Sequence, residues 1–595
     1  MTSRAGAGGY GGSLGRRSHR WDSVAPPELR VTTAHEAAEL DSCTIAAGVP
    51  SRALMQRAGA AAAGEIFRLL HDSVNGVVLV YAGAGNNGGD GWVVARSLAA
   101  AGVRVTVVTV GDARTDDARA ERELAETEPL VSVIPFAERE RDSAPAAPGV
   151  VVDAILGTGA KGAPREPAAS AIACITQHRE RGSTIVSLDI PSGVDADSGG
   201  DENAVRADVT LTFGTIKRGL LVARASAGRI VLLDIGLARV GEDGALRDAR
   251  STASQVASQV ASQVASSHPS PNTSSRASLV DGRWLRSVIP PFAADAHKGT
   301  RKKLVIVGGQ IGMAGASVLA ARAAMRSGIG MVRLVVAPES LPIVQGSEPH
   351  ALARAWPDDA ETGWDDVVGG WADAVLVGPG LGASSGTRQM VERLLASWRG
   401  PVVLDADALN VFAGEAEALG QRLGGRQALL TPHVVEFARL SGLEVTDVLE
   451  RRFDVGADLA RATGAAVLLK GVPTIVTAPD GSRLVSSAGT PALAAAGSGD
   501  LLGGIAATLL AQVGDAQRAG AAAAWVHGRA AEIAESGRRR RGRGGGARRR
   551  WVRSGEGARG ITLADIEDAI GRVWLEDAWI PSYPVLAELP AVGGA

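Results

Sequence analysis

Two glycine-rich segments that each carry an aspartate are the parts of this chain best suited to chemistry. They are Gly83–Gly91 (GAGNNGGDG) and Ala496–Asp500 (AGSGD). Each precedes a helical pattern, so backbone N–H groups at a helix start, with few side chains in the way, can bind a phosphate. Phosphate binding alone does not require the aspartate, which can also exchange a proton. The sequence therefore predicts two phosphate-sized sites and two linked activities.

Further polar residues follow strand-like apolar runs in the first half of the chain. Asp153 ends one run and precedes Gly157–Ala163, and Asp189 ends another and precedes Ser192. The carboxyl ends of parallel strands meet at one edge of a sheet, so we expect these residues to converge with Gly83–Gly91 on one ligand site.

The first segment is not the G-x-G-x-x-G of dinucleotide-binding folds. Its amides, Asn86 and Asn87, can bind a ribose, a phosphate or an alkali cation. Lysine is rare in this chain, and a lysine that persists where arginine supplies most positive charge is expected to be needed as a compact ammonium, unless it survives by compositional accident. The lysines are Lys161, Lys217, Lys298, Lys302, Lys303 and Lys470.

In the second half, the glycine amides of Gly497–Asp500 can neutralise a transferring phosphoryl group, and the carboxylate of Asp500 can accept a hydroxyl proton. This short motif is weak evidence by itself. It gains weight from other segments at the ends of strand-like runs, namely Gly308–Gly309 with Gly315–Ala316, Gly378–Gly382, Asp405–Asn410, Thr431–His433 and Lys470–Thr474.

Apolar runs alternate with helical patterns in both halves, which predicts the α/β class with mainly parallel sheets covered on both faces. A helical lead-in over about Ala34–Leu70 precedes the first predicted strand, and a helix over Leu563–Val573 closes the second half. The predicted strands are Val77–Val80, Val103–Val110, Val150–Leu156, Thr184–Ile190, Val209–Phe213 and Ile230–Ile235, then Lys303–Val307, Met331–Val336, Ala374–Val377, Pro401–Leu404, Ala428–Leu430, Ala465–Leu469 and Thr474–Thr477.

Composition shifts divide the chain into domains. A disordered leader is expected over 1–28, a first domain over 29–245, a low-complexity linker with Ala-Ser-Gln-Val repeats over 246–280, and a second domain over 281–595. An arginine-rich loop is expected at 536–558 within the second domain, solvated rather than bound to nucleic acid.

The overall composition is ordinary for a soluble chain. The 595 residues carry a net charge of -2, and Cys43 and Cys174 are the only cysteines, so neither a disulfide framework nor a thiolate metal cluster is expected. The sequence predicts no signal peptide and no membrane span. We expect a cytoplasmic homo-oligomer with small-molecule substrates.

The first-half motifs GAGNNGGDG, VVDAILGTGAKG and SLDIPSGVDADSG resemble the YjeF N-terminal domain, the NAD(P)HX epimerase, over about Val31–Val240. The resemblance implies a Rossmann-like three-layer αβα domain that holds NADHX or NADPHX, nicotinamide cofactors hydrated on the ring, and interconverts their R and S epimers. The residues implied for binding are Asn86, Asn87, Gly88, Gly89, Asp90, Gly157, Thr158, Gly159, Ala160, Lys161, Gly162, Ala163 and Asp189, and those implied for a potassium ion are Asn87, Asp153 and Ser192.

Epimerisation needs proton transfer at or next to the hydrated carbon, so a carboxylate at the ligand edge of the sheet is required. Asp189 is the candidate catalytic acid or base, although it can instead cap the turn that follows it. Lys161 is a catalytic candidate that stabilises negative charge or binds phosphate. Lys217 is a weaker candidate of the same kind.

The second-half motifs resemble the ribokinase-like fold, and most closely its YjeF C-terminal branch, the NAD(P)HX dehydratase, over about Trp284–Val573. The bacterial branch is ADP-dependent, which implies a second αβα domain that uses ADP, with Mg2+, to phosphorylate the ring hydroxyl and release phosphate and AMP. Asp500 would activate the hydroxyl. The nucleotide would bind Lys470, Gly471, Val472, Pro473, Thr474 and Gly499, and the hydrate would bind Ala316, Gly382, His433 and Asp500.

One departure from that pattern concerns His433, because Val434 and Val435 stand where the family has Pro-Gly before Glu436. Two other functions stay open at this point. The second domain can be a kinase for a small vitamin-precursor alcohol, and the first can be a catalytically silent binding module. The intact polar motifs of the first domain favour the bifunctional repair enzyme.

Overall fold

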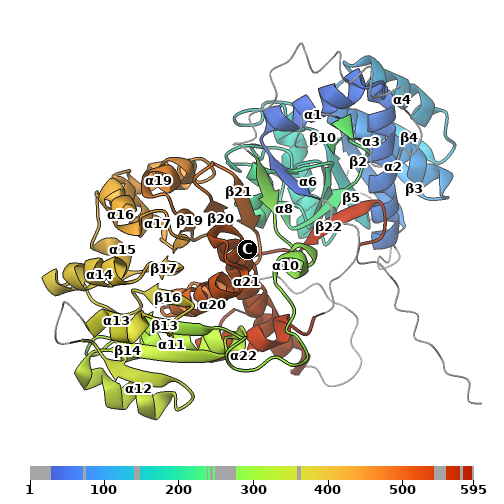
Figure 1. Cartoon of the computed structure of the whole chain (residues 1–595). Coiled ribbons are helices and arrows are strands. Elements are labelled where there is room, and N and C mark those ends of the chain that lie inside the picture. Colours follow the sequence, from blue (N-terminus) through green and yellow to red (C-terminus); the bar gives the residue numbers. More distant parts are fainter. Residues whose placement is uncertain are drawn as a thin grey trace, which may run out of the picture.

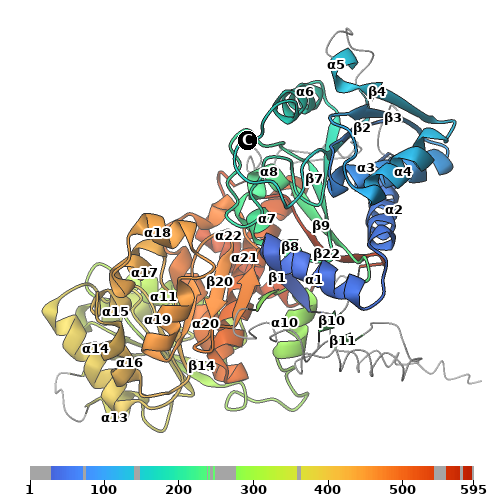
Figure 2. The same cartoon turned by 90° about the horizontal axis from the view of Figure 1, so that it is seen from above.

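The computed structural model describes residues 28–70, 76–139, 148–237, 239–240, 246–247, 276–357, 363–541, 558–576 and 581–592. Two α/β lobes lie side by side (Figure 1), and the view from above shows helix α1 and strands β1 and β8 where the lobes meet (Figure 2). The predicted α/β class is confirmed. Most of the predicted leader, the Ala-Ser-Gln-Val repeats and the arginine run beyond 541 lie outside the described residues.

The first lobe is built on an eight-stranded sheet in the order β22-β9-β7-β6-β5-β2-β3-β4. Every neighbouring pair is parallel except β22 with β9. The strands are β2 (Val77–Ala82), β3 (Arg104–Thr109), β4 (Val131–Pro135), β5 (Val150–Ala154), β6 (Thr184–Leu188), β7 (Val209–Phe213), β9 (Arg229–Leu233) and β22 (Val585–Leu589).

Helices cover both faces of this sheet. One core contains residues of α2 (Ser51–Leu70) and α3 (Asn86–Ala100), and the other contains residues of α6 (Ala168–Glu180). The predicted helical lead-in is two helices, α1 (Ala34–Ala46) and α2, because Gly48 takes a positive φ of 97° and Pro50 lacks the N–H that a continuous helix needs.

The second lobe is built on a twelve-stranded sheet in the order β15-β14-β13-β16-β17-β18-β19-β20-β21-β12-β1-β8. It is parallel from β15 to β19 and mixed beyond. The strands are β1 (Leu29–Thr32), β8 (Ile216–Lys217), β12 (Ala277–Leu279), β13 (Lys303–Val307), β14 (Met331–Val336), β15 (Leu352–Ala355), β16 (Ala374–Val377), β17 (Val402–Leu404), β18 (Ala428–Leu430), β19 (Ala466–Leu469), β20 (Thr474–Thr477) and β21 (Arg483–Ser486).

Two cores lie on opposite faces of this sheet. One contains residues of α11 (Ala314–Arg326), α20 (Ser498–Val513), α21 (Ala516–Arg541) and α22 (Leu563–Val573), and α22 has the predicted bounds. The other contains residues of α14 (Ser385–Ser397), α16 (Ala416–Leu423), α17 (Val434–Ser441) and α19 (Gly456–Thr463). Residues 536–541 continue α21, so they do not belong to the predicted loop.

The two lobes exchange strands across the predicted domain limits at three places. β22 comes from the end of the chain but pairs with β9 in the first sheet, as the red arrow beside the blue lobe shows (Figure 1). β1 comes from the start of the chain but pairs with β12 in the second sheet, and β12 lies within the predicted linker. The sheet to which each of these short strands belongs is decided by its backbone pairing, not by its position in the chain.

Residues of both halves of the chain pack in one shared apolar core. Val31 and Ile216 from the first half pack in one cluster with Phe453 and Val485 from the second half and with Leu589 from the end of the chain. The lobes are therefore parts of one packed molecule. None of the helices among the described residues is both long and apolar enough to cross a membrane.

The strand exchange predicts that the end of the chain stabilises the first lobe. Deletion of residues 582–595 leaves β9 as an edge strand and removes the Pro590 carbonyl that accepts from Arg224. Val585 and Leu589 are buried. Their loss should lower the free energy of unfolding of the first lobe by on the order of 4 kcal/mol, at about 1.5–3 kcal/mol for each such side chain.

Hydrogen–deuterium exchange checks this expectation. In the shortened chain, amides of β9 should exchange faster while those of β13 and β16 keep their protection. A chain that lacks only residues 593–595 keeps β22 and should exchange like the full chain. Equal protection of β9 in all three proteins would contradict the assignment.

Candidate functional site

A cavity of about 1020 Å³ opens at the carboxyl edge of the first sheet. Its size fits a dinucleotide, because ligand sites span about 300–1,000 Å³. The predicted binding residues that line it are Asn86, Asn87, Asp90, Gly157, Thr158, Gly159, Ala160, Lys161, Gly162, Ala163 and Asp189. The weaker candidate Lys217 lines it as well, together with residues that the sequence analysis did not assign to the site, among them Asp41 and Arg114.

Gly88 and Gly89 are buried behind this cavity and set the position of helix α3. A Cβ on Gly88 would lie 1.9 Å from the carbonyl oxygen of Gly83, and one on Gly89 would lie 2.6 Å from the Met55 side chain. Only glycine allows this close approach. The helix start therefore presents Asn86, Asn87 and Asp90 to the cavity.

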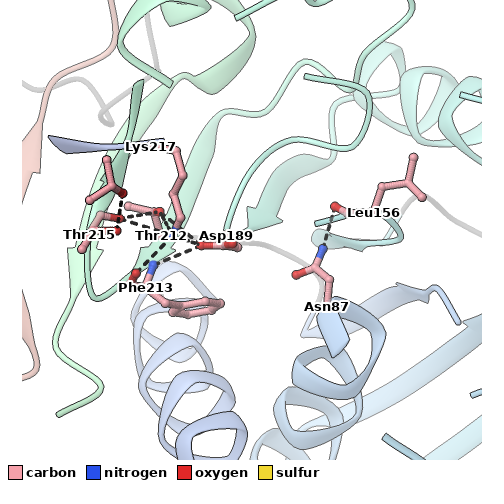
Figure 3. Close-up of polar contacts among 8 residues, drawn as sticks. Asn87, Leu156, Asp189, Thr212, Phe213, Thr215 and Lys217 are labelled. Carbon is pink, nitrogen blue, oxygen red and sulfur yellow. Dashed lines mark hydrogen bonds and ion pairs between the residues drawn. The ribbon is translucent and has the colours of Figure 1, made fainter. Parts of the chain in front are cut away.

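The Asn87 side chain has one hydrogen-bonding atom without a partner. Its Nδ2 donates to the carbonyl oxygen of Leu156 over 2.9 Å, as Figure 3 shows, while its buried Oδ1 has no hydrogen-bond partner. A buried polar atom without a partner costs free energy unless a ligand satisfies it. Asn87 Oδ1 thus fits a bound cation or a ligand donor.

Asp153 and Ser192 form a buried cluster beside that atom. Ser192 donates to Asp153 from its Oγ over 2.6 Å and from its backbone N–H over 2.8 Å, and Ser187 Oγ donates over 2.8 Å. The Leu156 N–H donates to Ser192 Oγ over 2.8 Å, so Leu156 connects this cluster with Asn87. Burial raises the pKa of Asp153, which these hydrogen bonds oppose.

This oxygen cluster contains one carboxylate, an amide and hydroxyl oxygens. Such a donor set suits a weakly charged alkali cation better than Mg2+, which demands tight octahedral coordination. The described part of the chain holds no group of three or more His, Cys, Asp or Glu side chains arranged for a metal ion. The residues present fit potassium at the predicted place.

Asp189 is held by Lys217. The Lys217 ammonium pairs with Asp189 Oδ1 and also donates to the carbonyl oxygen of Phe213 over 3.1 Å and to Thr212 Oγ1 over 3.2 Å (Figure 3). Only 4% of the Lys217 side chain is exposed, against 16% for Asp189. Asp189 has a φ of 61°, in the left-handed region that side chains rarely adopt. A buried ammonium thus fixes the carboxylate at the cavity wall.

The ranking of the two lysines differs from the sequence analysis, in which Lys161 comes before Lys217. Lys161 is exposed on the cavity wall, where its charge helps to lower the pKa of Asp195. Lys217 instead contacts the candidate acid–base residue directly. The signal for Lys217 was its position at the end of β8, whose pairing with β1 the sequence pattern does not reveal.

Two more carboxyl groups face the same cavity. Burial, together with the negative charges of Asp189 and Asp41, raises the pKa of Asp90 well above its ordinary value. Burial also raises the pKa of Asp41, which the Lys217 ammonium opposes. Asp90 is therefore biased toward its neutral, proton-donating form while Asp189 is ion-paired. Groups with environments that differ in this way can divide the roles of acid and base.

The second candidate site lies at the start of α20. Lys470 Nζ donates to Asp405 Oδ1 over 2.5 Å, and Thr431 Oγ1 donates to the same oxygen over 2.8 Å. A Cβ on Gly499 would lie 3.3 Å from Lys470 Nζ, so the ammonium lies directly beside the glycine loop. Asp405 is 1% exposed and is not among the residues that the sequence analysis assigned to the site.

Asp500 follows Gly499 in the first turn of α20. Burial, with the charges of Asp405 and Asp407, raises its pKa to about 6, although Lys470 opposes the shift. Asp500 is thus mostly ionised at neutral pH yet still basic enough to accept a proton, which is the property of a general base.

Behind this turn, Ser498 Oγ lies 3.2 Å from Nε2 of His527, a buried residue of α21. Burial, with the charge of Lys470, lowers the pKa of His527 to about 4. His527 is therefore neutral at physiological pH and supports the start of α20 without adding charge.

Two of the predicted hydrate-pocket residues lie together. A Cβ on Gly380 would lie 3.1 Å from Ala316 Cβ, and Gly382, two residues later, donates from its backbone N–H to Asp407 Oδ2 over 2.8 Å. His433 begins α17, where its Nδ1 accepts from the N–H groups of Val435 and Glu436. His433 therefore acts as the N-cap of this helix.

The predicted nucleotide loop joins β19 to β20. Arg452 donates from Nη1 to the carbonyl oxygen of Val472 over 2.6 Å, and a Cβ on Gly471 would lie 2.2 Å from Arg452 Nη2. The Val472 side chain is half exposed. The loop thus has one arginine behind it and an apolar side chain open to a ligand.

Comparison with known proteins matches both halves of the chain. Residues 304–541 match the family described as NAD(P)H-hydrate dehydratase, and residues 51–219 match the YjeF-related protein N-terminus. The chain is 36% identical to the bifunctional NAD(P)H-hydrate repair enzyme Nnr of Salinibacter ruber, over 86% of this chain and 92% of the relative. The Nnr enzyme of Escherichia coli is 31% identical over 81% of this chain and 84% of the relative.

Among solved structures, the ADP/ATP-dependent NAD(P)H-hydrate dehydratase of Bacillus subtilis, co-crystallised with ATP and Mg2+, is 26% identical and matches with a TM-score of 0.41. The match covers 50% of this chain and 96% of that one.

The first site is a dinucleotide-sized cavity with an ion-paired aspartate. The second site has, next to a glycine loop, an aspartate whose pKa is raised to about 6. Together they define a two-site enzyme for nucleotide-like substrates. The relatives and family matches specify that class further. The chain belongs to the family of bifunctional NAD(P)H-hydrate repair enzymes.

Proposed function

We propose that this chain repairs hydrated nicotinamide cofactors in two linked steps. The first site epimerises the R and S forms of NADHX and NADPHX, and the second dehydrates the S form to NADH or NADPH with consumption of ADP. The observation that supports the proposal is that one chain of this family holds both candidate catalytic aspartates in suitable surroundings, Asp189 paired with Lys217 and Asp500 with a pKa of about 6.

At the first site we propose that the glycine loop, with Asn86 to Asp90 and Gly157 to Ala163, binds the cofactor at the cavity that these segments line. Asp189, ion-paired with Lys217, accepts a proton near the hydrated carbon. Asp90, biased to its neutral form, is placed to return one. The exposed Lys161 is proposed to bind a phosphate of the cofactor.

We further propose that Asn87, Asp153 and Ser192 hold a potassium ion. The partnerless Asn87 Oδ1 supports the proposal, because a cation there would satisfy it. A cation would also compensate the buried charge of Asp153, whose pKa burial raises. The ion would supply a fixed positive charge close to the cofactor-binding loop that contains Gly157.

At the second site Asp500 is proposed to take the proton of the ring hydroxyl while that oxygen attacks the β-phosphorus of ADP. AMP leaves, and the phosphorylated hydrate then loses inorganic phosphate and a ring proton to restore the reduced cofactor. Gly499 and Lys470 are placed beside Asp500 to neutralise the transferring group. Gly471 to Thr474 are proposed to hold the nucleotide, with Mg2+ on its phosphates, and Ala316, Gly382 and His433 to face the hydrate.

Single substitutions should separate the two steps. With a mixture of both NADHX epimers and ADP, Asp189→Asn and Lys217→Met should stop recovery of NADH absorbance once the S epimer is used, because epimerisation is lost and dehydration is kept. Asp500→Asn should abolish NADH recovery but leave epimerisation intact. Chromatography of the two epimers measures both steps. Full conversion of the mixture by Asp189→Asn would contradict the assigned role of Asp189.

The pKa of Asp500 predicts an acid limb for dehydration. A general base must be ionised, so kcat/KM should fall about tenfold per pH unit below a pH of about 6. Asp405→Asn removes a like charge and leaves Lys470 without its carboxylate partner, so the limb should move to lower pH. Asp458→Asn, an exposed surface variant, is the control and should leave the limb unchanged. If the acid limb of the Asp405→Asn variant moved to higher pH, the assigned effect of the Asp405 charge would be wrong.

The potassium proposal predicts an ion dependence that only the first step has. Replacing K+ with tetramethylammonium, which is too large for the site, should slow epimerisation at least about tenfold, the usual cost of losing a catalytic charge. Asn87→Leu removes the partnerless Oδ1 and should make the remaining rate insensitive to K+. The rate of S-epimer dehydration by the same preparation is the control. An epimerisation rate that does not respond to K+ would refute the site.

A further inference from the structure

The two candidate sites are connected through one sheet. Lys217 lies on β8, which pairs with β1 in the register Thr32 to Lys217. β1 pairs with β12, β12 with β21, and β21 with β20. β20 begins at the end of the predicted nucleotide loop, Lys470–Thr474. The lysine of the first site and the nucleotide loop of the second therefore belong to one continuous set of strands.

Side-chain contacts also connect the first site with the second half of the chain. Arg218, the neighbour of Lys217, is buried, and its Nη1 lies 3.2 Å from Asp454 Oδ1 in the second half of the chain. Its guanidinium also lies over the ring of Phe453, 5.2 Å from the centroid. Arg483 of β21 reaches the same Asp454 oxygen over 3.4 Å. Arg218 thus binds Asp454 by charge and Phe453 by stacking.

Residues 451–454 form a turn that reaches the nucleotide loop on its other side. The Asp454 N–H donates to the Arg451 carbonyl oxygen over 2.8 Å, which closes the turn. Arg452, inside the turn, donates to the Val472 carbonyl oxygen over 2.6 Å and fills the space beside Gly471. Burial lowers the pKa of Arg452, whose Nε has no hydrogen-bond partner, so the loop carbonyl is its principal anchor.

We infer that Arg218, the neighbour of Lys217 of the first site, is a positioning residue for nucleotide binding at the second site: through Phe453, Asp454 and Arg452 it holds the loop at Gly471 and Val472 in its nucleotide-binding position. The inference rests on the proposed role of Lys470–Thr474. Asp500 and Gly499 lie on α20, and Lys470 is fixed separately by Asp405, so the chemical groups do not depend on this contact.

The inference has a specific kinetic consequence. A loop that is not held must be ordered by the nucleotide itself, so the affinity for the nucleotide falls by the fraction of molecules in the competent state. The chemical step and the binding of the hydrate are unchanged. Linkage between sites of this kind usually amounts to about fivefold or more.

The test measures dehydration of the pure S epimer of NADHX, which needs no epimerisation, and ADP affinity by calorimetry. Arg218→Ala should raise the KM and the Kd for ADP about five- to tenfold, with kcat and the KM for the hydrate within about twofold. Arg218→Lys keeps the charge but lacks the planar guanidinium, so it should give an intermediate value. Arg229→Ala is the matched control. It breaks the pair with Glu588 on the other exchanged strand and should leave ADP affinity unchanged.

A double-mutant cycle locates the effect. Arg452→Ala should weaken ADP binding as much as Arg218→Ala does, and the double variant should be no weaker than either, because both act through one turn. An unchanged ADP affinity in Arg218→Ala, or additive losses in the cycle, would overturn the inference. So would equal losses in kcat and in both KM values, which indicate general destabilisation.

The proposed function can fail separately from this inference. If the wild-type chain binds ADP but does not dehydrate the hydrate, the proposed function is wrong and the calorimetric comparison still decides the role of Arg218. If the wild-type chain binds no ADP, both are wrong.

Discussion

The backbone hydrogen bonds of strand β1 are the interaction on which the arrangement of this molecule depends. β1 pairs with β12 on one side and with β8 on the other, and these two neighbours come from different parts of the chain. Without β1, β8 would have no partner in the sheet, and the lysine at its end would not be fixed against Asp189. A four-residue strand near the start of the chain therefore determines both how the lobes join and where the first site's ammonium lies.

Both sites solve the same electrostatic problem with the same pair of groups. A buried lysine is costly unless a carboxylate compensates it, and a buried carboxylate has its pKa raised by burial. Lys217 with Asp189 and Lys470 with Asp405 meet both needs at once, each at the carboxyl end of strands. Each pair also lies next to an unusual backbone, with a φ of 61° at Asp189 itself and 50° at the residue after Asp405. Two of the few lysines in this chain thus have roles that arginine, a broad planar group, does not fill.

The sequence predicted the interior of each lobe well, because near-continuous apolar runs such as β2 and β13 allow only buried parallel strands. Among the strands that it missed are β1, β12 and β22, which have three to five residues and no pattern that distinguishes them from loops. Their strand state comes from partners that are distant in the chain. Residues of the predicted motifs, such as Asn87 and Asp189, line the first cavity. Asp41 and Asp405 were not assigned and Lys217 was ranked below Lys161, because proximity to Asp189 or Lys470 is a property of the fold alone.

Because of the strand exchange, the two lobes are joined by a packed interface and not by a linker alone. A flexible linker would raise the local concentration of one site's product near the other without coupling their affinities. Domains joined in that way move relative to one another unless their interface is large and apolar. Here the interface contains a shared apolar core in which Val31 and Ile216 pack with Phe453 and Val485. Phe453 also stacks beneath Arg218. A core of this kind transmits a displacement instead of absorbing it, because closely packed side chains have no free volume to take it up. The second site's loop is linked to this core through Arg452, the neighbour of Phe453, which donates to the Val472 carbonyl oxygen. Coupling of the two affinities is therefore the physical expectation for such an interface.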